Sequence, residues 1–134
     1  LQRSRLILAQ EYLYTAFDWR VGVLRGEPLF VCQYMMSRNH WQIVRHKTDG
    51  TFHQGGFKTF AVDQAPPDVV ETATRAAVLI GDGLYGVDLK QTDNGLFVIE
   101  VNDNPNLDRG VEDKVIKDQL YVRILEEFIR RIDQ

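Results

Sequence analysis

The sequence predicts an α+β domain in which an antiparallel sheet is flanked by helices. Short apolar runs, rich in aromatic and β-branched residues and bounded by glycine turns, are typical of strands joined as hairpins. Two other segments, 66–80 and 112–132, have apolar residues at helical spacing instead. Because the strands come before and between these helices, we expect neighbouring strands to be antiparallel.

Composition limits the class of protein. The chain has 134 residues, 26% of them charged, and a formal net charge of −3 at pH 7, which fits one globular domain spanning residues 1–134. Lysine and arginine are scattered, so we expect no nucleic acid partner. No apolar run reaches the ~20 residues of a membrane-spanning helix, so no membrane partner is expected either. Cys32 lies in an apolar run and is predicted to be a buried, inert thiol in a reducing compartment, the cytoplasm.

The first half of the chain predicts mostly strands. Residues 6–13 form either a strand or a short apolar linker. Residues 17–36 predict two strands around the turn at 25–28. The polar stretch 37–57 predicts one short strand and a long loop, and such a loop in a compact domain is usually functional or mobile.

Two helices are expected in the second half. A proline pair suits the first turn of the helix at 66–80, and Gly81 to Gly83 would end it. Its expected inward residues are Val69, Ala73, Ala76, Ala77 and Ile80. The final helix is predicted to run from Glu112 to Ile132, with a stripe at four-residue steps formed by Ile116, Leu120, Ile124 and Phe128.

Between the helices, residues 84–91 and 96–102 predict a hairpin. Side chains alternate between the faces of a strand, so Asp88 faces the same side as Glu100 if the two residues are directly paired. That register leaves a three-residue loop at 93–95, in which the last position favours the left-handed conformation of glycine. It also pairs Leu89 with Ile99.

The polar side of this hairpin is predicted to carry an all-oxygen cluster formed by Asp88, Glu100 and Asn102. The same register sets Gly86 opposite Asn102, which would leave room for a ligand. Crowded carboxylates repel one another unless a cation neutralises them, and Mg²⁺ binds one or two carboxylates together with substrate phosphates. The alternative from the pattern alone is a solvated polar face that ends in a capped turn.

These residues also resemble a known family. The order of "GLYGVDLK", a glycine turn and "VIEVNDNPNLDRGVED" is similar to the C-terminal half of ATP-grasp enzymes, and within them to RimK-like carboxylate–amine ligases. "QEYL" near the start resembles the hinge strand that cradles adenine, and "FDWR" resembles the D-x-R strand that follows. The match in order and spacing runs from Gln10 to the final helix.

The resemblance implies a role for each matched residue. Asp88, Glu100 and Asn102 would hold Mg²⁺, or Mn²⁺, and Arg20 would face the γ-phosphate of ATP. The adenine edge would meet Glu11 together with the backbone of Tyr12 and Leu13. A glycine pair near the phosphates and the acceptor substrate would correspond to Gly55 and Gly56, although an arginine and an asparagine that usually precede this pair are not matched at the same spacing.

The resemblance further implies an ATP- and Mg²⁺-dependent ligase that joins a carboxylate to an amine, as in amino-acid or glutamate ligation to a peptide or protein terminus. The chain would be the C-terminal ATP-grasp subdomain and a fragment of a longer protein, inactive alone because the phosphate-gripping lysines lie elsewhere. The alternative of another class is a non-catalytic nucleotide-binding or scaffolding module, and a third is a structural α+β domain.

Overall fold

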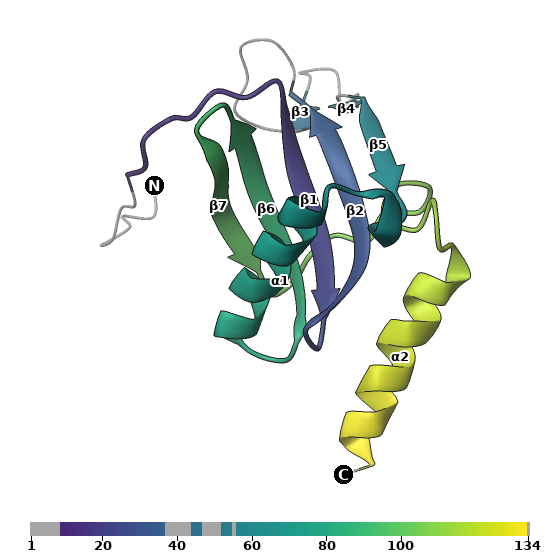
Figure 1. Cartoon of the computed structure of the whole chain (residues 1–134). Helices are drawn as coiled ribbons and strands as arrows, with labels where there is room; N and C mark the ends of the chain where they lie inside the picture. Colours follow the sequence, from purple (N-terminus) through teal and green to yellow (C-terminus); the bar gives the residue numbers. More distant parts are fainter. Residues whose placement is uncertain (1–8, 37–43, 47–51, 55, 134) are drawn as a thin grey trace, which may run out of the picture.

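The computed structural model describes residues 9–36, 44–46, 52–54 and 56–133. In this part of the chain the elements follow one another in the order shown in Figure 1. They are β1 (Phe17–Leu24), β2 (Glu27–Met35), β3 (Val44–His46), β4 (Phe52–Gln54), β5 (Phe57–Phe60), a 3₁₀ turn (Val62–Gln64), α1 (Pro67–Ile80), β6 (Leu84–Thr92), β7 (Gly95–Asn102) and α2 (Asp118–Ile132). Residues 9–14 carry no strand, so this described part of the N-terminal apolar stretch is a linker.

A single sheet organises the fold. Its five strands are ordered β5-β2-β1-β6-β7, and each neighbouring pair is antiparallel. β3 and β4 form a separate two-stranded sheet. α1 lies across one face of the five-stranded sheet (Figure 1), and α2 packs against β2 and the end of β1. The predicted α+β class with an antiparallel sheet is therefore confirmed.

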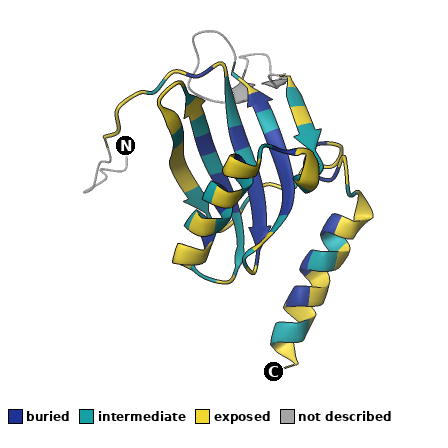
Figure 2. Cartoon of the chain, viewed as in Figure 1, coloured by how far each residue is buried: buried dark blue, intermediate teal, exposed yellow. Residues whose placement is uncertain are grey.

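The core under α1 is formed by apolar side chains. The helix buries three residues of its predicted stripe, Val69, Ala73 and Ala77, against the central strands. Figure 2 shows this burial concentrated on the middle of the sheet. Ile80 was expected to point inward but is 62% exposed, because it lies at the last position of the helix, beyond the sheet-facing turns.

A second core covers part of the opposite face. Strand β2 and the end of β1 supply side chains that pack against α2 and the segment before it. The buried members are Leu24, Leu29, Phe30, Cys32, Tyr34, Val111, Leu120 and Ile124. Cys32 is fully buried, as predicted, and burial raises the pKa of its thiol to about 11.

The final helix starts later than predicted. It begins at Asp118, and residues 110–117 form turns. Two acidic side chains explain this, since Glu112 accepts a hydrogen bond from the backbone N–H of Asp108 at 2.7 Å and Asp113 accepts one from Gly110 at 2.5 Å. These contacts fold the segment back on itself, and Lys117 has a positive φ of 51° that interrupts any helix there.

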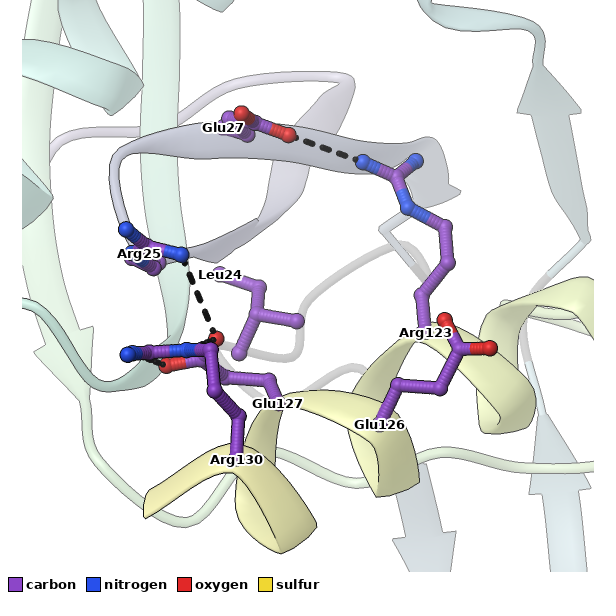
Figure 3. Close-up of a pocket in the computed structure, with 7 residues that line it drawn as sticks. All are labelled: Leu24, Arg25, Glu27, Arg123, Glu126, Glu127 and Arg130. Atoms are coloured by element: carbon purple, nitrogen blue, oxygen red, sulfur yellow. Dashed lines mark hydrogen bonds and ion pairs between the residues drawn. The ribbon is translucent and has the colours of Figure 1, made fainter. Parts of the chain in front are cut away.

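The inward face of α2 also differs from the predicted stripe. Phe128 is 46% exposed, whereas Glu127 is 8% exposed. Glu127 accepts hydrogen bonds from Arg130 and Arg131 of its own helix and lies 3.6 Å from Arg25. Figure 3 shows Glu127 with Arg25 and Arg130 beside a cavity of about 210 Å³ between α2 and the β1–β2 turn, where Arg123 also pairs with Glu27. Ion pairs thus fasten α2 to the turn.

The β6–β7 hairpin follows the predicted register only in the part away from its turn, from the Gly86–Asn102 pair to the Asp88–Glu100 pair. Asp88 is paired with Glu100, as expected, but Leu89 is paired with Val98 because Ile99 forms a bulge. The last pair before the turn is therefore Thr92 with Gly95, which leaves a two-residue loop at 93–94. The predicted pairing of Leu89 with Ile99 and the three-residue loop are wrong; the extra residue lies in the bulge rather than the turn.

Gly86 is opposite Asn102, as predicted, but the space above it is not open for a ligand. A Cβ atom on Gly86 would lie 2.7 Å from Cβ of Pro105. The proline therefore packs directly on the glycine and folds the polar turn after β7 back over β6. This close approach requires glycine and fixes where the polar turn begins.

Candidate functional site

The candidate site is a row of residues that crosses the sheet on the face opposite α1. Neighbouring strands place Cys32, Arg20, Asp88 and Glu100 side by side, from β2 through β1 and β6 to β7. The row changes from a buried thiol to an exposed carboxylate as it crosses the sheet. Three of the residues predicted from the sequence therefore lie next to one another, on three different strands.

Arg20 and Asp88 form a bidentate ion pair within this row. Arg20 Nε lies 2.7 Å from Asp88 Oδ1, and Arg20 Nη2 lies 2.8 Å from Asp88 Oδ2. The side chains are 17% and 19% exposed, so the pair is shielded from most solvent. The hydrogen bonds from Arg20 to Asp88 raise the pKa of the guanidinium above its ordinary value. Arg20 therefore balances the charge that we expected a metal ion to neutralise.

Glu100 and Asn102 complete the predicted all-oxygen set. Glu100 is exposed at the sheet edge and is the direct partner of Asp88 on the neighbouring strand. Asn102 lies two positions further along the same strand face and accepts a hydrogen bond from the Asn104 N–H at 2.8 Å. Two carboxylates and an amide oxygen on one face are ligands of the kind that Mg²⁺ prefers, so the donor set fits this ion.

No larger metal cluster accompanies these residues in the described ranges. Within residues 9–36, 44–46, 52–54 and 56–133, no group of three or more His, Cys, Asp or Glu side chains is arranged to hold a metal ion. Two carboxylates are enough for Mg²⁺ when substrate phosphates supply further oxygens, whereas a cage made of protein ligands alone needs more. The set thus suits a metal that arrives with a phosphate ligand.

A second ion pair lies on the same face, between Asp18 of β1 and Lys90 of β6, two residues along each strand from Arg20 and Asp88. Lys90 Nζ is 2.7 Å from Asp18 Oδ1 and 2.9 Å from Thr15 Oγ1, and Thr15 donates a hydrogen bond to Asp18 at 2.7 Å. Sequence reasoning missed Lys90. Its signal was its position two residues after Asp88, which places it on the same strand face.

Sequence reasoning also missed a buried pair beside Arg20. The ring centroid of Tyr34 lies 5.7 Å from Arg20 Cζ, within the range of a cation–π contact. The Tyr34 hydroxyl donates a hydrogen bond to Glu112, which is 1% exposed. Burial, with this hydrogen bond, raises the pKa of Tyr34 well above its ordinary value. Glu112 therefore joins the segment after β7 to β2, the neighbour of the strand that carries Arg20.

The predicted adenine-binding segment borders a cavity. A space of about 320 Å³ adjoins β6 and β7 and is lined by Gln10, Glu11, Tyr12, Leu13, Lys90, Val98 and Ile99. Tyr12 is 61% exposed, so one wall of this cavity is open. The Ile99 bulge contributes to the opposite wall. The structure therefore brings Glu11, Tyr12 and Leu13 close to the hairpin that carries Asp88 and Glu100.

The predicted glycine pair is only half described. Gly55 lies outside the described residues. Gly56 is exposed, and its carbonyl accepts a hydrogen bond from the Met35 N–H at 2.7 Å, at the end of β2. The structure places Gly56 next to β5, which is separated from β6 by two strands, β2 and β1. None of the helices in the described ranges is long and apolar enough to cross a membrane.

Solved structures share this fold. A D-alanine–D-alanine ligase of Bacillus anthracis, complexed with ATP, matches with a TM-score of 0.57 over 91% of this chain and 43% of its own, at 13% identity. The ATP-grasp ligase PsnB, complexed with a phosphomimetic variant of a minimal precursor, Mg and ADP, matches with a TM-score of 0.51 at 22% identity, over 84% of this chain and 34% of its own. The fold is therefore that of ATP-grasp ligases.

Sequence comparison identifies the family within that fold. The model of the RimK-like ATP-grasp domain matches residues 5–128, and the chain belongs to this family. A probable alpha-L-glutamate ligase 1 of Shewanella denitrificans is 38% identical over 93% of this chain and 39% of its own length. A probable alpha-L-glutamate ligase of Maridesulfovibrio salexigens is 40% identical over 79% of this chain and 33% of its own. The chain thus spans about a third of the curated relatives it matches.

Proposed function

We propose that the chain is part of an ATP- and Mg²⁺-dependent ligase that joins a carboxylate to an amine. The observation that carries the proposal is the row of Arg20, Asp88 and Glu100 across three strands, in a chain of the RimK-like ATP-grasp family. An arginine suited to phosphate and two carboxylates suited to a metal ion are side by side in this row. These are the groups that phosphoryl transfer requires, since it depends on charge stabilisation and positioning.

The residues have separate roles in this proposal. Asp88, Glu100 and Asn102 would hold Mg²⁺, or Mn²⁺, which supplies positive charge beside the transferring phosphoryl group when bound. Arg20 would bind the γ-phosphate oxygens with its planar fork. Glu11, Tyr12 and Leu13 would hold the adenine in the cavity that they line. Backbone N–H groups of the Gly55–Gly56 pair would lie near phosphate or acceptor oxygens.

The chemistry takes two steps. A carboxylate oxygen of the first substrate attacks the γ-phosphorus of ATP, which gives an acyl-phosphate and ADP. The amine of the second substrate then attacks the acyl carbon, an amide bond forms and phosphate leaves. No side chain of the protein needs to become covalently attached, and charge stabilisation and orientation are sufficient.

The names of the relatives support a substrate class. The curated relatives are called probable alpha-L-glutamate ligases, and we propose L-glutamate as the amine. The carboxylate would be the terminus of a peptide or protein. We also propose that the reaction takes place in the cytoplasm, the reducing compartment that a single cysteine in an apolar run predicts.

The domain assignment remains a proposal as well. The chain would be the C-terminal subdomain of the ATP-grasp domain, and the lysines that grip the α- and β-phosphates would lie on another subdomain. The partial coverage of the relatives is consistent with one part of a longer protein. A non-catalytic nucleotide-binding or scaffolding module is the competing function, but such a module has no need for Arg20, Asp88, Glu100 and Asn102 on one face.

Titration of the protein encoded by the complete gene with a non-hydrolysable ATP analogue tests this function. Binding should tighten when Mg²⁺ is present, and Asp88→Asn should remove most of the Mg²⁺ effect while the chain stays folded. Asp93→Asn, in the exposed turn of the same hairpin, is the matched control and should bind like the unaltered protein. Nucleotide binding that ignores both Mg²⁺ and Asp88→Asn would contradict the ligase proposal.

A further inference from the structure

We propose that Arg20 occupies the metal site in the nucleotide-free protein, so that Arg20 and a divalent cation compete for the Asp88 carboxylate. This inference deepens the proposed function and rests on it for the identity of the site. It starts from the bidentate contact, in which each Asp88 oxygen accepts one N–H of Arg20, at 2.7 and 2.8 Å. The ligand that Mg²⁺ would need is thus already engaged by a cation of the protein.

Geometry makes full sharing of this carboxylate unfavourable. A guanidinium that faces both oxygens takes the two lone pairs on its side of the carboxylate, and Mg²⁺ requires nearly ideal octahedral geometry at about 2.0–2.1 Å. Asp88 is 19% exposed, so little water would screen the repulsion between a metal ion and Arg20. We therefore expect a bound metal to lengthen or break at least one of the two contacts.

When it leaves Asp88, the Arg20 guanidinium can bind a phosphate group of the nucleotide instead. When a nucleotide brings a metal to Asp88 and Glu100, the released guanidinium finds phosphate oxygens in the same place, which suit its fork as well as a carboxylate does. The Tyr34 ring, 5.7 Å from Arg20 Cζ, would remain beneath the side chain during this exchange. Metal and nucleotide would then bind cooperatively, because the phosphate takes up the arginine that the metal displaces.

The inference makes an unusual prediction for Arg20 variants. Arg20→Gln should bind Mn²⁺ more tightly than the unaltered chain when no nucleotide is present, and it should bind the Mn²⁺ complex of an ATP analogue more weakly. Removal of Arg20 frees both Asp88 oxygens and takes away one repelling charge, and such a coupling changes affinity about 5- to 150-fold, so the affinity for the metal alone should rise by about tenfold or more. Arg20→Lys keeps the charge but loses the planar guanidinium. Its affinity for Mn²⁺ alone should lie between those of the unaltered chain and Arg20→Gln.

The test measures free Mn²⁺ by electron paramagnetic resonance during titration of the chain, without nucleotide. Arg75→Gln is the matched control, since it removes one positive charge from an exposed position of α1, on the opposite face of the sheet, and should leave Mn²⁺ affinity unchanged. Arg20→Gln with Asp88→Asn should lose the gain. Mn²⁺ affinity that is unchanged or reduced in Arg20→Gln, or no Mn²⁺ binding in any variant, would overturn the proposal.

A second measurement applies even if Arg20→Gln does not fold. The Nε–H resonance of Arg20 in the unaltered chain, followed by nuclear magnetic resonance, should shift as Mg²⁺ saturates the site without nucleotide. A resonance that stays fixed at saturating Mg²⁺ would contradict the competition. The two proposals can be told apart by these results. A lack of nucleotide binding would contradict the ligase function. Tighter Mn²⁺ binding by Arg20→Gln would still support competition between Arg20 and the metal for Asp88.

Discussion

At the residue scale, one ion pair changes how the polar hairpin is understood. Strand periodicity was enough to predict that Asp88 and Glu100 share a face, because both residues belong to one hairpin. It could not predict that Arg20 neutralises Asp88. That contact joins residues 68 positions apart and depends on the register between β1 and β6, for which the sequence has no turn to fix the pairing.

Glu112 was missed for a related reason. A glutamate in a predicted helix is ordinarily assigned to the solvent face, and nothing local shows that its partner is Tyr34, 78 positions earlier. The carboxylate is nevertheless 1% exposed and accepts two hydrogen bonds, from the Tyr34 hydroxyl and the Asp108 N–H. Buried polar pairs of this kind become visible only once the strand and the loop are placed together.

Tyr34→Phe tests the importance of that pair. The substitution keeps the ring that packs beneath Arg20 but leaves a buried Glu112 oxygen without its hydrogen-bond donor. The free energy of unfolding should fall by about 1–3 kcal/mol, measured by urea denaturation and circular dichroism. Tyr121→Phe loses a longer hydrogen bond, 3.1 Å to Asp113, and should cost less. Equal losses for both variants would show that Glu112 does not depend on Tyr34.

Glu127 predicts a pH dependence of stability. Hydrogen bonds from Arg130, and then Arg131, lower the pKa of Glu127 to about 2, against about 4.3 in an unfolded chain. Because the folded pKa is the lower one, the stabilisation is complete above about pH 4.3 and disappears as the pH falls towards 2. The unaltered chain should thus have a higher Tm than Glu127→Gln at pH 6, and the gap should close at pH 2.

Glu126→Gln serves as the control for this titration. Glu126 is the neighbouring residue on the same helix and is exposed. The Tm of this variant should stay close to that of the unaltered chain at both pH values. A gap for Glu127→Gln that is the same at pH 6 and pH 2 would contradict the role of the arginines.

At the element scale, type and order were predictable but some boundaries were not. The helix from Pro67 to Ile80 followed from its proline start and apolar spacing, and both were local signals. The start of α2 and the register near the β6–β7 turn were wrong. Two acidic side chains that cap turns delay the helix, and the Ile99 bulge shifts the hairpin. Both features depend on contacts that residue spacing does not encode.

Gly95→Ala tests the turn of this hairpin. Gly95 has a φ of 124°, which residues with a Cβ atom rarely adopt, although no atom lies within 4 Å of the added methyl group. Any loss of stability must then come from backbone strain, and we expect about 1–2 kcal/mol in the free energy of unfolding. Gly56→Ala is the control, with an ordinary contact of 3.7 Å to Met35 and an expected change within about 0.5 kcal/mol.

At the scale of the whole molecule, the fold class was predictable because strand and helix patterns agreed with each other along the chain. The arrangement of the sheet was not, since strand order depends on long-range pairing: β1 lies at its centre, between β2 and β6. This central position is what brings Arg20 to Asp88. The candidate site is therefore a property of the sheet as a whole, and no single motif contains it.

The proposed division of the ATP-grasp domain has a direct consequence. The chain spans about a third of its curated relatives, so we expect it to form no amide product by itself. The reason is that Arg20 and the metal ligands would contact only one side of the ATP phosphates. Chromatography of incubations with ATP, Mg²⁺ and L-glutamate checks this, and amide formation by the chain alone would contradict the division.

Transfer of labelled oxygen tests the proposed reaction most directly. The protein encoded by the complete gene would be incubated with ATP, Mg²⁺, L-glutamate and a glutamate-ended peptide whose terminal carboxylate carries two ¹⁸O atoms. An acyl-phosphate requires that one labelled oxygen leaves with the phosphate and one stays in the new amide, and mass spectrometry measures both. We predict one ¹⁸O in phosphate for each amide formed. Amide formation with unlabelled phosphate would contradict the proposed reaction.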